Sequence, residues 1–347
     1  MRSAPIGAAL EDAAPLSPDY QLGNEIGRGS FAVVLHCTDT RTGTRLAAKK
    51  LQRYVHGRLP AQQAAVVGAE AAAQAALCAA SPSILRLVDV RQDDNYLYLI
   101  QELCLMDLAA WLQQRGGAPL SGREAASILR QLLSALAACH HAGIAFRDVK
   151  PANLLIREIN ANGLPMIVLA DFGCCRSTAD PPPASHASAG TPLYSSPESL
   201  HSAGGIEGDI WSAGVLLYHL LSGHYPFCDP RHRISQGEFW RRVAEAPIRT
   251  AGPAWHGVSP GAVALVHRML DRDCSSRITA EQAQQDPWLL DMTSSRASDW
   301  RRAGSGGAAE PAQPQLPERM QAGKGMVGNV LPGMPASLAS GPLHASV

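Results

Sequence analysis

The sequence predicts an α+β fold with two unequal lobes, a small β-rich lobe followed by a larger, mainly helical one. In residues 20–100, short β-branched and apolar stretches alternate with one Ala-rich helical run near 61–80, which is typical of a small sheet with a helix packed on it. From Leu105 onward the apolar residues follow a helical period. An arrangement of this kind predicts a cleft between the lobes, a common place for a small-molecule site.

The individual elements follow from local patterns. Four short apolar or β-branched stretches predict the strands of the small lobe, at residues 31–36, 45–51, 85–90 and 96–101. In the larger lobe, Ser-Gly-Arg-Glu at 121–124 has the spacing of a capping box and precedes an apolar-periodic run, so a helix is expected to begin there. A mostly helical remainder follows.

Composition also sets the expected limits of the domain. Residues 1–18 are rich in Ala and Pro without periodicity, and residues 291–347 are dominated by Gly, Ser, Ala, Pro and Gln. Neither segment has enough large apolar groups for a core, so both are predicted to be disordered. The expected domain is therefore 20–290, with the small lobe at 20–103 and the large lobe at 104–290.

Charge and hydropathy exclude several classes of protein. Lys plus Arg and Asp plus Glu are equal at 30 each, so no strong field marks the 347-residue chain for nucleic acid or an anionic membrane. The longest nearly apolar run, 210–221, is too short to cross a bilayer, and Glu11 and Asp12 interrupt the N-terminal apolar stretch. The eight cysteines lack zinc-site spacing. We expect a soluble, cytoplasmic protein with reduced thiols, no membrane span and no nucleic-acid partner.

A glycine-rich segment precedes the second predicted strand. It is a G-x-G-x-x-G run in which alanine replaces the last glycine, and Gly27 and Gly29 would let the backbone bend closely over phosphates. An ordinary hairpin turn is the alternative for this segment alone. A dinucleotide-binding turn would need a helix directly after the glycines, whereas the β-branched pair Val33 and Val34 favours a strand. The whole segment is Ile26, Gly27, Arg28, Gly29, Ser30, Phe31, Ala32, Val33 and Val34.

Lysine is scarce in this chain, which makes its positions informative. Only four of the 30 basic residues are lysines, at 49, 50, 150 and 324, so arginine supplies nearly all the surface charge. A compact ammonium group suits a phosphate as a point charge in a way that a planar guanidinium does not. Such a lysine needs a carboxylate to hold it in place. Glu70 is the only acidic residue between Asp39 and Asp89, so we predict a Lys49–Glu70 ion pair.

Two further motifs supply the rest of a phosphoryl-transfer site. Residues 146–153 read F-R-D-V-K-P-A-N, and D-F-G follows at 171–173. Phosphoryl transfer needs a carboxylate to accept the hydroxyl proton, ligands for Mg²⁺ and positive charge near the transferred phosphate. In that order, the candidates are Asp148, then Asn153 with Asp171, then Lys150 with Lys49.

On these motifs, residues of about 20–290 resemble a eukaryotic-type protein kinase, with G-T-P-L-Y-S-S-P-E at 190–198 in place of the segment that closes the activation loop. The resemblance implies a bilobal protein kinase-like fold, ATP and Mg²⁺ as cofactors, and protein substrates. It further implies that residues 26–34 cover ATP and that Gln101 is the gatekeeper. Adenine would lie between Val34, Ala47 and Leu155, with hinge backbone groups from Glu102 and Cys104 and a ribose contact from Asp107.

The resemblance also implies a specificity. D-V-K-P-A-N looks like the serine/threonine version of the catalytic loop, and Thr191 matches the threonine that helps to orient the acceptor hydroxyl. We therefore expect a serine/threonine protein kinase. The runner-up is a pseudokinase that acts as a nucleotide-binding scaffold or allosteric partner, and a kinase-fold enzyme for a small molecule is a third option. G-S-F-A-V-V looks particularly like the autophagy-initiating kinases.

Three residues are expected in supporting roles, and a fourth departs from the usual pattern. Asp209 resembles the aspartate that supports the catalytic loop, and Arg277 resembles the arginine that pairs with the glutamate at 198. Phe146 replaces the usual histidine, whose apolar stacking an aromatic ring can fill. Gln74, four residues after Glu70, falls where an apolar residue normally joins an internal stack, so a loose contact is expected there.

The activation loop is expected to be regulated by phosphate. Arg147 precedes the expected catalytic aspartate. The resemblance implies that the positive charge of Arg147 pairs with a phosphorylated residue on the activation loop. Arg176 could join it. We expect Ser188 or Ser185 to be the activating site, modified by an upstream kinase or by autophosphorylation.

Overall fold

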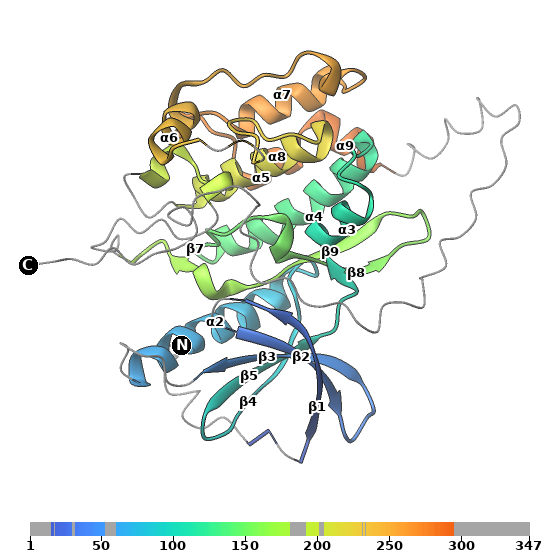
Figure 1. The fold of residues 1–347 in the computed structure, drawn as a ribbon, viewed down its shortest axis with the longest axis vertical. Helices are drawn as coiled ribbons and strands as arrows, with labels where there is room; N and C mark the ends of the chain where they lie inside the picture. Colours follow the sequence, from blue (N-terminus) through green and yellow to red (C-terminus); the bar gives the residue numbers. More distant parts are fainter. Residues whose placement is uncertain are drawn as a thin grey trace, which may run out of the picture.

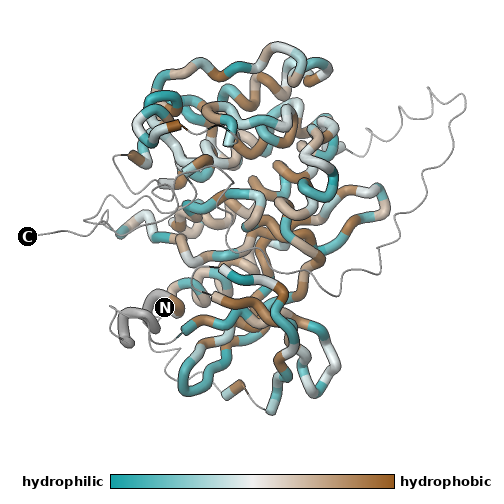
Figure 2. The backbone as a smooth tube through the Cα atoms, in the orientation of Figure 1, coloured by the Kyte–Doolittle hydropathy of each residue, from teal (hydrophilic) through white to brown (hydrophobic). Residues whose placement is uncertain are grey.

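The computed structural model describes residues 15–16, 18–29, 32–52, 60–180, 192–200, 205–230, 232 and 234–294. A β-sheet forms one end of the molecule and a group of helices the other (Figure 1). Apolar segments concentrate where the two parts meet and inside the helical part (Figure 2). The predicted α+β fold with two unequal lobes is confirmed.

The small lobe is a five-stranded antiparallel sheet with one helix against it. The strands lie in the order β1-β2-β3-β5-β4. Leu51 and Leu99 form a buried cluster with Val67 and Ala71 of the helix. Lys49 precedes Leu51 by two residues on the same strand, so it points to the same, helix-facing side. The bounds are β1 (Tyr20–Arg28), β2 (Ala32–Asp39), β3 (Arg45–Gln52), α2 (Pro60–Ala80), β4 (Leu87–Gln92) and β5 (Tyr96–Glu102).

Helix α2 presents one buried face to the rest of the protein. Among its described side chains, Val67, Glu70, Ala71, Gln74 and Leu77 are all buried. Their spacing of three and four residues places them on one side of a helix. Two of the five are polar, so this helix brings a carboxylate and an amide into the interior.

The large lobe is built around helix α4 (Gly122–His141). The expected capping box begins it, because the Glu124 amide donates to Ser121 Oγ at 3.3 Å and the Ser121 amide donates to Glu124 Oε2 at 3.0 Å. Trp211 stacks on Phe227 with ring centroids 5.4 Å apart in the same core. The other helices are α3 (Leu108–Gln114), α5 (Ile206–Ser222), α6 (Gln236–Glu245), α7 (Pro260–Met269), α8 (Ala280–Gln284) and α9 (Pro287–Thr293).

Short strands of the large lobe carry the loops of the candidate site. A three-stranded sheet has the order β6-β8-β9, and β10 pairs with β7. These strands are β6 (Met106–Asp107), β7 (Ile144–Ala145), β8 (Leu154–Ile159), β9 (Pro165–Leu169) and β10 (Arg176–Ser177).

Two further expectations concern the cysteines and membrane insertion. All eight cysteines are free thiols, and burial raises the pKa of Cys104 to about 12 and that of Cys174 to about 11, so both stay protonated at neutral pH. In the part of the chain that the structure describes, no helix has the length and apolar character needed to span a membrane.

Candidate active site

Three charged side chains meet where the two lobes adjoin. Lys49 on β3 lies with its Nζ 2.5 Å from Glu70 Oε1 on α2 and 2.8 Å from Asp171 Oδ1. The predicted Lys49–Glu70 ion pair is therefore present. Glu70 is buried, whereas the Asp171 side chain is 52% exposed, so one end of this cluster is closed and the other is accessible.

Burial and mutual attraction shift the pKa values of this cluster. Burial alone would lower the pKa of Lys49, but the carboxylates of Asp171 and Glu70 outweigh it and raise that pKa. Burial raises the pKa of Glu70 in spite of the nearby ammonium group. The surrounding protein also opposes ionisation of the half-exposed Asp171, but the Lys49 charge prevails and lowers the pKa of Asp171. Lys49 therefore stays cationic between an ionised Asp171 and a more weakly acidic Glu70.

The loop after β7 holds a second cluster around Asp148. Lys150 Nζ donates to Asp148 Oδ2 at 2.7 Å, and Asn153 Nδ2 donates to the same oxygen at 2.9 Å. Asn153 Nδ2 also lies 2.9 Å from the backbone carbonyl of Asp148, so it ties the loop to itself. Asp148 and Asn153 are both buried. The D-x-x-x-x-N spacing thus brings the three predicted residues together.

Two non-glycine residues within the described ranges have positive φ, and both lie in this site. They are Arg147 with φ 71° and Asp171 with φ 65°. Such conformations are strained and persist only where the surroundings enforce them. Asp209 supplies part of that enforcement, because its carboxylate accepts the Phe146 amide at 2.8 Å and the Arg147 amide at 2.6 Å. Asp209 therefore lies where the resemblance predicted support for the loop.

An aromatic contact joins the motifs at 146–153 and 171–173. Phe146 is fully buried, and its ring meets that of Phe172 edge to face with centroids 5.4 Å apart. Phe172 directly follows Asp171. The predicted apolar stacking role of Phe146 is thus present, and it connects the loop of Asp148 with that of Asp171.

The described residues of the glycine-rich segment lie on the antiparallel strands β1 and β2, and Val33 and Val34 lie in a strand as predicted. Gly27 pairs with Val34, Arg28 pairs with Val33, and the Gly29 amide donates to the Ala32 carbonyl at 2.8 Å. Ile26 is exposed, and the Arg28 side chain pairs with Glu25 on the surface. The next element after the glycines is strand β2 rather than a helix, so the arrangement is not that of a dinucleotide-binding turn.

The expected adenine-side residues lie on both lobes. Ala47 is buried on β3 and Val34 is half-buried on β2 opposite Lys49. Leu155 on β8 and Cys104 pack against a buried cluster formed by Leu85, Val168 and Ala170. The residues that the resemblance assigns to the adenine site thus come from both lobes and lie near their junction.

Two residues expected at the nucleotide already have protein partners that sequence reasoning missed. Glu102 accepts a bidentate pair from Arg157, with Nε at 2.8 Å and Nη2 at 2.7 Å, and its backbone amide donates to the Arg86 carbonyl. Asp107 caps α3, because its Oδ1 accepts the Ala110 amide at 2.8 Å. Asp107 directly before a helical run was a cap signal in the sequence.

The donor set near Asp171 suits a hard cation. Asp171 and Asn153 offer carboxylate and amide oxygens, which are ligands that Mg²⁺ accepts. In the described segments, no group of three His, Cys, Asp or Glu side chains is placed to hold a metal. Mg²⁺ commonly uses one or two carboxylates together with substrate phosphates and water, so two protein ligands fit this ion.

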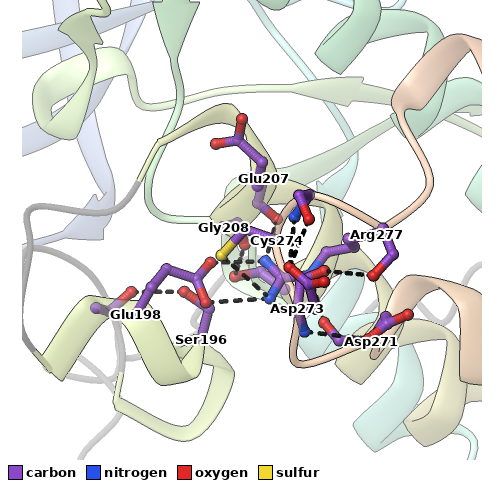
Figure 3. Close-up of polar contacts among 12 residues, drawn as sticks. Ser196, Glu198, Glu207, Gly208, Asp271, Asp273, Cys274 and Arg277 are labelled. Carbon is purple, nitrogen blue, oxygen red and sulfur yellow. Dashed lines mark hydrogen bonds and ion pairs between the residues drawn. The ribbon is translucent and has the colours of Figure 1, made fainter.

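The Arg277 cluster in the large lobe matches its prediction (Figure 3). Arg277 is fully buried through its side chain and pairs with Glu198, with Nη1 2.6 Å from Oε1 and Nη2 3.0 Å from Oε2. It also donates to the backbone carbonyls of Glu207 and Asp271, each at 2.8 Å. The guanidinium thus ties the segment at 197–200 to α5 and to the loop before α8.

Several predicted residues lie outside those that the structure describes. They are Ser30, Phe31, Thr191 and the proposed phosphorylation sites Ser185 and Ser188. The predictions made for them stay predictions.

Comparison with known proteins gives a consistent result. A family model described as the protein kinase domain matches residues 20–289. Calcium-dependent protein kinase 22 of Oryza sativa subsp. japonica is 33% identical over 285 residues, covering 81% of this chain and 48% of that protein. The calcium/calmodulin-dependent protein kinase type II alpha chain of Drosophila melanogaster is also 33% identical over 285 residues, covering 81% of this chain and 51% of its own length.

A third relative carries the hydroxyl specificity in its name. Serine/threonine-protein kinase PEPKR2 of Arabidopsis thaliana is 32% identical over 285 residues, covering 80% of this chain and 55% of that protein. The chain thus spans about half the length of these curated relatives. None of the three names points to the autophagy-initiating kinases, so that closer assignment gains no support. The family match covers both lobes and every charged cluster described above, and the chain belongs to the protein kinase family.

Proposed function

We propose that this chain is a catalytically active serine/threonine protein kinase, which transfers the γ-phosphoryl group of ATP to hydroxyls of protein substrates. One observation carries the proposal. Lys49, Glu70 and Asp171 converge from three separate elements, while Asp148 is held by Lys150 and Asn153. An active kinase needs both clusters in place.

Each side chain has a defined task in this proposal. Asp148 accepts the proton of the substrate hydroxyl. The hydroxyl oxygen bonds to the γ-phosphorus as the bond between that phosphorus and the ADP oxygen breaks. Lys150 holds the Asp148 carboxylate and adds positive charge near the transferred group. Lys49, fixed by Glu70, binds the nucleotide phosphates. Asn153 and Asp171 would hold Mg²⁺, which neutralises phosphate charge when it is bound.

A substitution at Asp148 tests the proposal. Asp148→Asn removes the proton acceptor and keeps the shape, so we expect phosphate transfer from labelled ATP to a serine/threonine peptide array to fall at least about 100-fold. Asp286→Asn is the matched control, because Asp286 is a buried helix cap on α9 paired with Arg268, away from the site. Equal signals from wild type and Asp148→Asn would refute the assignment.

The alternative is a pseudokinase that binds nucleotide without transferring phosphate. It predicts that Mg²⁺ and ATP raise the melting temperature while wild type and Asp148→Asn give the same background transfer. The three residues whose loss usually marks that class, Lys49, Asp148 and Asp171, are all present and in contact with partners. This observation favours the active enzyme.

Phosphorylation of the activation loop is proposed as the regulator. Arg147 and Arg176 lie close together, because Arg176 on β10 pairs with Ala145, two residues before Arg147. Burial lowers the pKa of Arg147 and the Arg176 charge lowers it further, an effect that a phosphate beside both arginines would offset. We expect phosphate on Ser185 or Ser188 in the active protein. Full activity with an unmodified loop in mass spectrometry would contradict this.

A further inference from the structure

Two buried glutamines join helix α2 to the sheet behind the charged cluster. Gln101, on β5, donates through Nε2 to Gln74 Oε1 at 2.8 Å, and Gln74 Nε2 donates to the Leu85 carbonyl at 3.0 Å. Gln74 is fully buried and Gln101 is 6% exposed. We call Gln74 and Gln101 the glutamine bridge. The expected loose contact at Gln74 is wrong, because each amide finds a partner.

The glutamine bridge reaches the supports of both carboxylates that hold Lys49. Gln74 lies one helical turn after Glu70 on the same buried face of α2. Leu85, which accepts from Gln74, donates its amide to the Leu169 carbonyl at 2.9 Å. Leu169 ends β9, two residues before Asp171. A continuous set of hydrogen bonds therefore runs from β5 through α2 to the strand that leads to Asp171.

Helix α2 has few large apolar side chains that could hold it against the sheet by packing alone. Its sequence is mostly alanine, and the described apolar residues of its buried face are Val67, Ala71 and Leu77. Because hydrophobic stabilisation scales with the apolar area buried, such a face contributes little for its length. Apolar contacts are also non-directional, whereas a buried amide fixes distance and angle and is costly to leave without a partner.

We propose that the glutamine bridge is a positioning element that holds α2 at the distance where Glu70 meets Lys49. Among the described residues, the side-chain hydrogen bonds of Gln74 and Gln101 go to each other and to the Leu85 carbonyl, so in this role they act through Glu70. The inference rests on the proposed functions of Lys49 and Glu70.

Methionine substitutions separate the hydrogen bonds from the volume they occupy. Gln101→Met leaves Gln74 Oε1 without its donor, and Gln74→Met leaves both the Gln101 amide and the Leu85 carbonyl without partners. We expect each single change to lower kcat about five-fold at a temperature where the protein is fully folded. The double variant has an apolar pair and no orphaned side-chain amide, so its kcat and melting temperature should lie closer to wild type than those of either single variant.

The Glu70→Gln background tests whether the bridge acts through Glu70. If it does, adding Gln101→Met to Glu70→Gln produces no further loss of kcat, whereas a general structural effect gives the same five-fold loss in both backgrounds. Gln284→Met is the matched control, since Gln284 Nε2 donates to the Leu133 carbonyl at 3.2 Å within the helical lobe. We expect it to leave kcat and KM unchanged.

The outcomes divide clearly. An unchanged kcat in both single variants, equal losses in both Glu70 backgrounds, or a double variant with the product of the two single losses would each overturn the inference. The wild type and Asp148→Asn, assayed alongside, report on the proposed kinase activity independently. If the wild type transfers phosphate and the bridge variants have an unchanged kcat, this inference is refuted while the proposed function is retained.

Discussion

Removing Arg277 should destabilise the large lobe strongly, because its guanidinium is fully enclosed. The side chain is 0% exposed, and that of its partner Glu198 is 20% exposed. In Arg277→Ala the carboxylate loses a bidentate partner, and the carbonyls of Glu207 and Asp271 lose their donors. Breaking a buried ion pair from one side typically costs about 3 to 5 kcal/mol. Partial exposure of Glu198 places this pair toward the lower end of that range, since water can solvate the carboxylate again.

The expected loss converts into a measurable shift in melting temperature. For a domain of this size, each kcal/mol lowers the melting temperature by roughly 2 to 4 °C, so a loss of about 3 to 4 kcal/mol should make Arg277→Ala melt roughly 6 to 16 °C below wild type. Differential scanning calorimetry or fluorimetry measures this shift. Arg277→Lys keeps the charge but cannot reproduce the planar bidentate geometry, so it should fall between the two.

A second arginine of the same lobe supplies the control. Arg241 pairs with Glu238 at 2.8 Å, but the side chains are 60% and 30% exposed, so water reaches both partners. An ion pair of this kind contributes little to stability, so Arg241→Ala should shift the melting temperature by no more than a few degrees. Equal shifts for Arg241→Ala and Arg277→Ala, or no shift in Arg277→Ala, would refute the argument from burial.

Two further outcomes are expected. Phe146→Leu keeps an apolar side chain but loses the edge-to-face contact with Phe172, so we expect a loss of about 1 kcal/mol, seen as a lower midpoint in denaturant unfolding; an unchanged midpoint would contradict it. The pKa of Glu198 is lowered because the Arg277 pair outweighs the opposing effect of burial. Its stabilising contribution is therefore present above the ordinary value of 4.5 and lost as pH falls below it, so the melting temperatures of wild type and Glu198→Gln should converge in acid, and a constant difference would contradict this.

The sequence predicted the two lobes, the Lys49–Glu70 ion pair and the residues of the site because these features depend on local patterns or on residue types that are rare in the chain. The β-branched stretches of the small lobe and the capping box of α4 are local patterns that tertiary packing reinforced. The partner of Lys49 followed from scarcity, since Glu70 was the only carboxylate in a long segment. The spacing between Asp148 and Asn153 fits within one tight loop, so the chain itself brings them together.

Sequence alone determined the fold class, the identity of the charged groups and their order along the chain. Only the tertiary structure decided how those groups are held. The positive φ of Arg147 and Asp171 depends on neighbours distant in the chain, such as Asp209. The bond between Gln74 and Gln101 likewise joins residues from different elements, and a single glutamine gives no sign of its partner. A buried side-chain amide destabilises the fold unless it has hydrogen-bond partners, and only the packed structure determines whether those partners are present.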